Sequence, residues 1–358
     1  TGKSTLVKFI ISALGVDNRD VCYIAYTGKA ALVLQEKGCP NAMTAHKLLY
    51  KSFPRGDGTF YHKPAKPLEH PYKIVCVDEV SMLPKEMWDL LLSHHIFVIA
   101  LGDPFQLPPI NASSDNHVLD HPDIFLEEIM RQAQDSEIIR LSMDIRAGKS
   151  LEKFDGKEVQ VIDKEDVVSG MFTWADQVIV AKNQTRHFYN DLMREYKFGA
   201  HGPEPMDGDK IICLRNNWNI SNENDDVLVN GLTGYISNIQ YLHSPIKDLD
   251  KIMLADFVPD MYSPEFPDRA YFREINMDQK LFLTHQPTIN AQNFRRVPAI
   301  MHPNEFDYGY SITCWKAQGS EYDKVLVFEE DFPYGEEHRR YLYTGITRAK
   351  KKLVLVRQ

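Results

Sequence analysis

Residues 1–11 read TGKSTLVKFII, and this stretch decides the fold that we expect. Its opening, TGKST, matches the second half of the phosphate-binding motif G-x-x-x-x-G-K-[ST], and a helix-like apolar run follows at once. In such a loop, backbone N–H groups at a helix N-terminus surround the phosphates, Lys3 contacts the β- and γ-phosphates, and the Ser4 hydroxyl ligates Mg²⁺. Ser and Thr also cap ordinary helices, so this segment alone leaves a plain helix start open. The first half of the loop and its strand are expected before Thr1, as in a chain truncated within the motif.

A second apolar run ends in two adjacent carboxylates. Residues 73–79 read KIVCVDE, which is typical of a buried parallel strand that delivers Asp78 and Glu79 to the carboxyl edge of its sheet. Asp78 would belong to the Mg²⁺ shell. Glu79 would polarise the water that attacks the γ-phosphate, because phosphoryl transfer depends on positioning and charge neutralisation. Acid pairs at strand ends are common, but together with Lys3 this pair predicts a nucleotide triphosphatase.

A third strand is predicted over residues 95–101, HIFVIAL, and the loop GDPFQLPP follows at residues 102–109. The prolines restrict this loop, and the amide of Gln106 can contact the γ-phosphate or the attacking water. The alternative is a plain Gly/Pro turn with a solvated Gln106. Because an open parallel sheet gathers its strand-end loops at one crevice, three such loops favour the functional interpretation.

Eight segments, in this order, resemble the motif set of superfamily 1 helicases, most closely the RecD-like branch. They are TGKST (1–5), AYTGKAALVL (25–34), MTAHKLL (43–49), VDEVSML (77–83), LGDPFQLPP (101–109), MRQ (130–132), YSITCWKAQGSEYDKV (310–325) and LYTGITRAK (342–350). The resemblance implies an α/β fold class with two RecA-like P-loop NTPase motor domains. It also implies a small β-hairpin insertion in the first domain and a small SH3-like β-barrel insertion in the second. ATP and Mg²⁺ would bind in the cleft between the motor domains, and single-stranded DNA would cross their top.

The resemblance assigns catalytic and nucleotide-binding roles to the matching residues. It implies catalytic roles for Glu79, Gln106, Arg131 and Arg348, of which the two arginines would reach the γ-phosphate from the second motor domain. A guanidinium placed there is worth roughly 10³ to 10⁵ in rate, whereas a lone arginine is usually a solvated helix residue. The implied nucleotide-binding residues are Thr1, Gly2, Lys3, Ser4, Thr5, Asp78, Gln318, Gly319 and Glu321, with Ser4 and Asp78 on Mg²⁺.

DNA contacts are implied for a further set of residues. Those that match family segments are Thr27, Gly28, Lys29, Thr44, His46, Thr313 and Trp315. Lys29 and His46 are otherwise ordinary polar residues of helix starts, and Trp315, which stands where the family often has His, either stacks on a base or belongs to the core. Gly345 likewise stands where the family often has Ala. Three aromatic residues of the inserted hairpin, which either stack on the separating base pair or anchor the hairpin, are Phe53, Phe60 and Tyr61.

Composition shifts along the chain suggest its domain boundaries. We expect the first motor domain over residues 1–110, with the hairpin, or pin, inserted at residues 51–71 around a turn at residues 55–58. Residues 111–122 read as a polar linker. The second motor domain would comprise residues 123–200 and 304–358, and the β-barrel-like insertion residues 201–303, where Gly-punctuated β-runs replace helical periodicity.

Length and cysteine usage fit a two-domain motor, whereas the net charge is less expected. A chain of 358 residues exceeds the range in which one core keeps growing. The formal net charge of −9 is unusual for a protein that tracks along phosphates, although a basic groove can coexist with an acidic surface. The five cysteines have no metal-ligand spacing and read as reduced core residues of a cytoplasmic protein. The apolar runs are strand-sized, so no transmembrane helix is expected.

The resemblance to the RecD-like branch implies an ATP-dependent DNA helicase that moves 5′ to 3′ on single-stranded DNA and unwinds duplex in replication, recombination or repair. Its expected partners are single-stranded DNA and the duplex fork, with single-strand-binding or recombination proteins as further partners of a monomeric motor in a bacterial or phage-infected cell. The alternative is a nucleotide-switched DNA-binding subunit of a larger recombination or nuclease complex. An ATPase that acts on RNA is a third possibility.

Overall fold

The computed structural model describes residues 3–54, 60–108, 117–119, 121–126, 136–199, 202–223, 227–243, 251–260, 271–289 and 301–358. The chain divides into two compact units. Unit 1 comprises Thr1–Leu49, Pro64–Tyr196 and Ser311–Gln358, and unit 2 comprises Tyr50–Lys63 and Lys197–Tyr310. Unit 1 contains two parallel sheets, and unit 2 is built from antiparallel strands.

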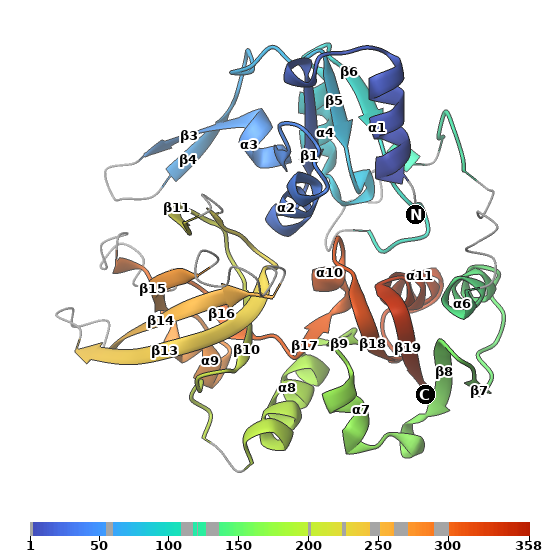
Figure 1. The fold of residues 1–358 in the computed structure, drawn as a ribbon, viewed down its shortest axis with the longest axis vertical. Helices are drawn as coiled ribbons and strands as arrows, with labels where there is room; N and C mark the ends of the chain where they lie inside the picture. The colour runs from blue at the N-terminus through green and yellow to red at the C-terminus, as the bar shows by residue number, and fades with distance from the viewer. Residues whose placement is uncertain are drawn as a thin grey trace. The chain divides into compact units, whose positions relative to one another are not determined.

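The first parallel sheet has the strand order β2-β1-β5-β6 (Figure 1). Its elements are α1 (Lys3–Ala13), β1 (Val21–Ala25), α2 (Gly28–Glu36), β2 (Met43–Thr44), α3 (Ala45–Leu49), β5 (Ile74–Val77), α4 (Lys85–Leu92) and β6 (Phe97–Ala100). α1 and α2 cover one face, because Val7 and Leu34 share a core with Tyr23 and Cys76. Every residue of β1 and β5 is buried, as expected of parallel strands covered on both faces. The predicted strand before Asp78 is therefore confirmed.

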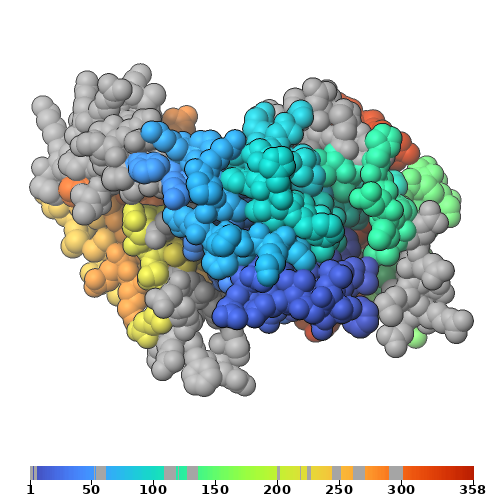
Figure 2. Space-filling model, turned by 90° about the horizontal axis from the view of Figure 1, so that it is seen from above, coloured from blue at the N-terminus to red at the C-terminus, as the bar shows by residue number. Residues whose placement is uncertain are grey.

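α1 is held to this sheet by its inner face. Val7 and Ile11 lie in the core, whereas Phe9 is 72% exposed on the outer face. α1 belongs to the dark-blue surface in Figure 2. Because Lys3 begins α1, the packing of Val7 and Ile11 fixes the helix end that the phosphate-binding motif occupies.

The predicted third strand is shorter than residues 95–101. α4 ends at Leu92, and the amides of Ser93, His94 and His95 donate back to carbonyls of the helix. His95 then takes a left-handed φ of 53°, which turns the chain into β6 at Phe97. His95 therefore belongs to the helix terminus, and the sequence prediction was wrong at this end.

The second parallel sheet has the strand order β17-β9-β18-β19-β8-β7, and only β7 is antiparallel to its neighbour. Its elements are α6 (Glu137–Arg146), β7 (Phe154–Asp155), β8 (Val159–Asp163), α7 (Ser169–Trp174), β9 (Gln177–Val180), α8 (Asn183–Phe198), β17 (Ser311–Thr313), α10 (Cys314–Ala317), β18 (Tyr322–Phe328), α11 (Glu336–Ile346) and β19 (Ala349–Arg357). Phe172 of α7 and Tyr189 of α8 pack on Phe328 at one face. α11 lies beside α6 (Figure 1), and a Cβ at its Gly345 would meet Val327 at 3.3 Å. The alanine that the family often has here would require Val327 to shift by a few tenths of an ångström.

Unit 2 contains a five-stranded antiparallel sheet in the order β15-β14-β13-β10-β16. Its elements are β3 (Tyr50–Pro54), β4 (Phe60–Pro64), β10 (Lys210–Cys213), β11 (Asn217–Ser221), β12 (Val227–Leu228), β13 (Thr233–His243), β14 (Lys251–Pro259), β15 (Phe272–Met277), α9 (Gln279–Thr284) and β16 (Phe306–Tyr308). Phe257 packs against Phe272 and Phe306 in its core. The predicted hairpin exists as the pair β3 and β4, and its turn lies outside the described residues.

Two details of unit 2 differ from the sequence predictions. β16 pairs with β10, so the chain leaves this sheet after Tyr308 and the return to the second parallel sheet begins at Ser311, not near residue 304. The insertion also contains a helix, α9, which Asp278 caps by accepting the amide of Leu281. Closure of the sheet into an SH3-like barrel stays a prediction.

Candidate nucleotide and DNA site

The two predicted acids lie immediately beyond β5. Glu79 has a left-handed backbone (φ 50°, ψ 49°), and its N–H donates to Asp78 Oδ1 at 3.1 Å. A non-glycine residue in this conformation is strained by about 1–3 kcal/mol, and such strain clusters at functional sites. Oε2 of Glu79 is buried and has no hydrogen-bond partner among the described residues. The Glu79 carboxylate thus has one buried oxygen available to a ligand.

Electrostatics favour a cation beside Asp78. Burial raises the pKa of this carboxyl, the neighbouring charge of Glu79 raises it further, and Lys3 acts in the opposite direction. Two adjacent carboxylates in a partly buried site offer the hard oxygen ligands that Mg²⁺ prefers. The residues present therefore fit the expected metal. Thr1 and Gly2 lie outside the described residues, as do the side chains of Ser4 and Thr5.

The loop after β6 is bound from the second parallel sheet. Leu107 donates its N–H to Thr344 Oγ1 at 2.9 Å, and its carbonyl accepts from Gln318 Nε2 at 2.7 Å. The indole of Trp315 donates to the carbonyl of Pro108 at 3.1 Å. Gln106, inside this loop, is 6% exposed, and its Oε1 has no hydrogen-bond partner among the described residues. Within unit 1, the predicted Gln106 and Gln318 thus come together.

Gly319 lies against the start of α2. Its φ is +74°, and a Cβ built on it would approach Ala30 Cβ to 3.1 Å and Thr27 Oγ1 to 3.9 Å. Thr27 caps the same helix, because its hydroxyl accepts the amide of Ala30 at 3.3 Å. Lys29 is 8% exposed, with its ammonium 5.5 Å from the ring of Tyr322. The α2 start and the turn at Gly319 therefore meet at one place in unit 1.

Arg348 is bound within its own half of unit 1. The side chain is 6% exposed and donates to the carbonyls of Thr344 and Ser320 at 3.1 and 3.2 Å and to Thr347 Oγ1 at 3.2 Å. Among the described residues, no hydrogen bond or ion pair joins it to the acids after β5. Arg131 lies outside the described residues. The approach of both arginines to a γ-phosphate stays a prediction.

The remaining predicted DNA contacts lie at several element ends. Thr44 is 3% exposed and accepts the amide of Lys47 at 3.2 Å, and His46 is exposed with its ring 5.8 Å from Tyr26. Thr313 is buried just before α10. Gly28 begins α2, Glu321 is exposed just before β18, and Trp315 is half-buried.

The hairpin aromatics are described only in part. Phe53 is 39% exposed, with the ammonium of Lys63 at 5.8 Å from its ring centre. The side chains of Phe60 and Tyr61 lie outside the described residues. The structure leaves both hypotheses for these aromatics, stacking and anchoring, as predictions.

Sequence reasoning missed four residues that hold the Gln106 loop. They are Asp103, Arg146, Tyr343 and Thr344. Tyr343 donates to Asp103 Oδ2 at 2.7 Å across a separation of 240 residues in the chain. Asp103, Tyr343 and Thr344 stand inside motif segments, but only the fold shows what they touch.

Two family models and several known proteins match parts of this chain. The model of an AAA domain matches residues 1–169, and the model of a UvrD-like helicase C-terminal domain matches residues 308–356. A stretch of 155 residues, 42% of this chain, is 34% identical to the ATP-dependent RecD2 DNA helicase of Deinococcus radiodurans. In both domain matches and in this relative, the chain is similar to superfamily 1 helicases of the RecD-like branch. The predicted family is confirmed.

The chain spans well under half of two relatives. It is 24% identical over 426 residues to the uncharacterized protein MJ1519 of Methanocaldococcus jannaschii, covering 99% of this chain and 36% of that protein. The match to RecD2 covers 21% of that protein. Both relatives are therefore much longer than this chain.

A solved structure supports the fold class. The Pif1 helicase from Bacteroides, in complex with ADP-AlF3 and ssDNA, aligns with 99% of this chain and 86% of its own, at a TM-score of 0.51 and 16% identity. This likeness concerns the fold. With the two parallel sheets of unit 1, it confirms the predicted α/β class with two RecA-like domains.

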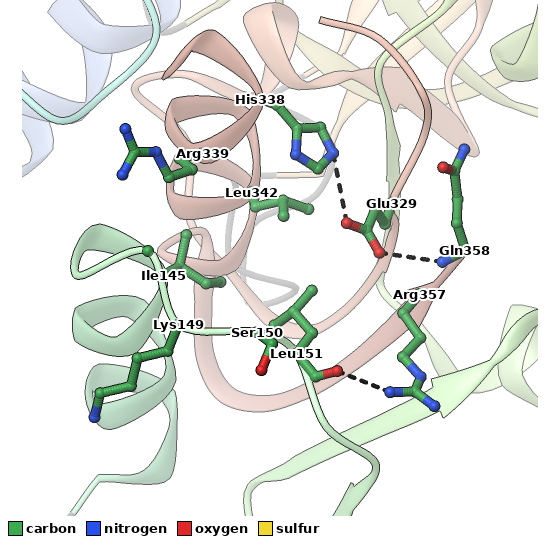
Figure 3. Close-up of a pocket in the computed structure, with 11 residues that line it drawn as sticks. Ile145, Lys149, Ser150, Leu151, Glu329, His338, Arg339, Leu342, Arg357 and Gln358 are labelled. Atoms are coloured by element: carbon green, nitrogen blue, oxygen red, sulfur yellow. Dashed lines mark hydrogen bonds and ion pairs between the residues drawn. The ribbon is translucent and has the colours of Figure 1, made fainter. Parts of the chain in front are cut away.

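A separate cavity of about 340 Å³ lies beside α6 and α11 (Figure 3). In it, Glu329 contacts His338 Nε2 at 3.5 Å and accepts the amide of Gln358 at 3.1 Å. None of the predicted site residues lines this cavity. The described helices include none that is long and apolar enough to cross a membrane.

Proposed function

We propose that this chain is the motor of an ATP-dependent DNA helicase. It moves 5′ to 3′ along single-stranded DNA and unwinds duplex ahead of it. The observation that carries the proposal is the binding of the Gln106 loop, which leaves the first parallel sheet, by Gln318 and Thr344 of the second. A loop shared by both RecA-like domains is suited to transmit the state of a nucleotide from one domain to the other.

The chemistry of hydrolysis is divided among residues of both domains. Lys3, Ser4 and Asp78 hold the triphosphate and its Mg²⁺, which neutralises phosphate charge when bound. Glu79 accepts a hydrogen bond from the attacking water and orients it. Its buried, unpartnered Oε2 supports this role, because a buried polar atom left unsatisfied costs about 1–3 kcal/mol and is expected to meet a ligand. Gln106 offers a second such oxygen.

The other nucleotide contacts come from both domains. Thr1, Gly2 and Thr5 belong to the same half of the phosphate-binding loop as Lys3 and Ser4, and Gln318, Gly319 and Glu321 face the nucleotide from the second domain. Arg131 and Arg348 stabilise charge on the γ-phosphate during transfer. For this step Arg348 exchanges its hydrogen bonds to the carbonyls of Thr344 and Ser320 for phosphate oxygens. The exchange replaces neutral acceptors by charged ones, which form stronger hydrogen bonds.

The DNA strand passes over the helix starts of both domains. In the first domain, the backbone at Gly28 and the side chains of Thr27, Lys29, Thr44 and His46 contact phosphates. Thr313 and Trp315 continue the path in the second domain. The hairpin of β3 and β4 meets the fork, with Phe53, Phe60 and Tyr61 as candidates for stacking.

Unwinding of tailed duplexes by the full-length protein tests the proposal. With ATP and Mg²⁺, a duplex with a 5′ single-stranded tail is unwound and the same duplex with a 3′ tail is not. ATP hydrolysis is stimulated by single-stranded DNA more than by RNA of the same sequence. DNA-stimulated hydrolysis without unwinding of either duplex would identify a nucleotide-switched DNA-binding subunit instead. Stronger stimulation by RNA would contradict the DNA assignment.

A further inference from the structure

Two residues of the second domain contact the Gln106 loop near its start. Tyr343 of α11 is 8% exposed, and its hydroxyl donates to Asp103 Oδ2 at 2.7 Å. The guanidinium carbon of Arg146, the last residue of α6, lies 3.6 Å from the ring centre of Phe105 and 5.9 Å from that of Tyr343. The rings of Phe105 and Tyr343 meet edge to face at 6.3 Å. Arg146 therefore stacks on Phe105 and also faces the ring of Tyr343.

The two contacted residues, Asp103 and Phe105, are linked to Gln106 through hydrogen bonds and the backbone of the loop. Oδ1 of Asp103 accepts the amide of Phe105 at 3.0 Å, and the carbonyl of Asp103 accepts the amide of Gln106 at 3.2 Å. Any movement of Asp103 or Phe105 thus moves the backbone that carries Gln106. Burial, and next the charge of Asp103, raise the pKa of Tyr343, so its hydroxyl stays a donor.

The two sides of the loop are bound differently. Beyond Gln106, the backbone of Leu107 is bound by Thr344 and Gln318. Before Gln106, side chains bind side chains: a charge-assisted hydrogen bond at Asp103 and a guanidinium stacked on Phe105. Arg146 lies outside all eight motif segments. Its contact with Phe105 therefore connects α6 to the loop, in addition to the contacts that motif residues of α10 and α11 make with it.

We propose that Arg146 and Tyr343 are positioning residues for Gln106. Through Phe105 and Asp103 they set where the Gln106 amide stands, so a shift of α6 and α11 is transmitted to the γ-phosphate side of the first domain. This inference rests on the proposed ATPase function, but the position of the loop can be measured without turnover.

The test uses three variants of the full-length protein and two matched controls. Tyr343→Phe removes only the hydroxyl, Arg146→Met removes the charge at similar volume, and Arg146→Lys keeps the charge without the planar group. Arg140→Met changes an exposed arginine of the same helix, and Tyr334→Phe removes the hydroxyl of a tyrosine that is 74% exposed.

We expect kcat for DNA-stimulated ATP hydrolysis to fall about 10-fold in Tyr343→Phe and in Arg146→Met, with KM for ATP within about 2-fold of wild type. Loss in kcat at constant KM is the sign of an interaction that acts on the transition state. Arg146→Lys recovers part of the rate. The double variant loses less than the product of the single effects, because both residues act on one loop. Both controls behave as wild type.

Hydrogen–deuterium exchange of peptides covering residues 103–108 gives a second readout that does not depend on activity. The loop amides exchange faster in Tyr343→Phe and Arg146→Met than in wild type or either control. If the wild-type protein shows no DNA-stimulated ATP hydrolysis, the proposed function is refuted. The exchange result would still decide whether these residues hold the loop. Wild-type kcat and exchange in both variants would overturn the inference, as would rate losses matched by Arg140→Met.

Discussion

Gly319→Ala probes the meeting point of α2 and the turn after α10. A Cβ at this position requires a left-handed residue at φ +74° and lies 3.1 Å from Ala30 Cβ. The backbone term costs about 1–2 kcal/mol for an L-residue. The contact is closer than ordinary van der Waals distance, and overpacking of this kind typically costs about 1–3 kcal/mol. We therefore expect the free energy of unfolding to fall by about 2–5 kcal/mol, the sum of the two terms.

Two other glycines separate the backbone term from the contact term. Gly15 (φ +63°) and Gly199 (φ +75°) also have a positive φ, and a Cβ built on either meets nothing within 4 Å. Their alanine variants should lose only the backbone term, about 1–2 kcal/mol. The measurement is urea unfolding of all three variants, monitored by circular dichroism. Equal losses in Gly319→Ala and in the two controls would show that the contact with Ala30 carries no energy, and the reasoning would fail.

Three further perturbations address the site. Glu79→Gln should keep Mg·ATP binding and lose turnover, because it retains the shape and removes the polarising charge; a wild-type rate of ATP hydrolysis would show that another residue is the catalytic acid. Asp78→Asn should raise the thermal midpoint of the nucleotide-free protein at neutral pH while abolishing Mg²⁺-dependent hydrolysis. The reason is that burial and Glu79 raise the pKa of Asp78, so its ionisation destabilises the fold as the pH rises above the usual aspartate pKa; an unchanged pH profile of stability in Asp78→Asn would contradict this. If the ring of Phe53 stacks at the fork, a contact worth about 1–3 kcal/mol per base, Phe53→Ala should impair strand displacement and spare DNA-stimulated hydrolysis. If both activities fall together with the melting temperature, the ring anchors the hairpin instead.

The strands and the acids could be predicted because local patterns determine them. A wholly apolar run such as residues 74–77 must be buried on both faces, and its carboxyl end then fixes the place of Asp78 and Glu79. His95 escaped prediction because its apolar neighbours resemble a strand start, while the helix hydrogen bonds that end at His95 are set by the length of α4.

The contacts that join distant segments could not be predicted in the same way. The sequence marks Thr344 and Gln318 as parts of motifs, but it does not say that both bind one residue, Leu107. Arg146 carries no local signal at all, because an arginine at a helix end is usually a solvated residue near the negative end of the helix dipole. Its stacking on Phe105 appears only once α6 and the loop are folded together.

The two hydrogen bonds at Leu107 engage its main chain only. Any residue at this position except proline, which lacks the N–H, would offer the same amide and carbonyl to the side chains of Thr344 and Gln318. The side chain of Leu107 is fully buried, so the choice of residue here depends on core packing and not on these two hydrogen bonds. The two motor domains can therefore diverge in sequence independently at this junction. Chimeras that combine the first domain of one relative with the second domain of another should keep the junction wherever the loop retains its backbone path.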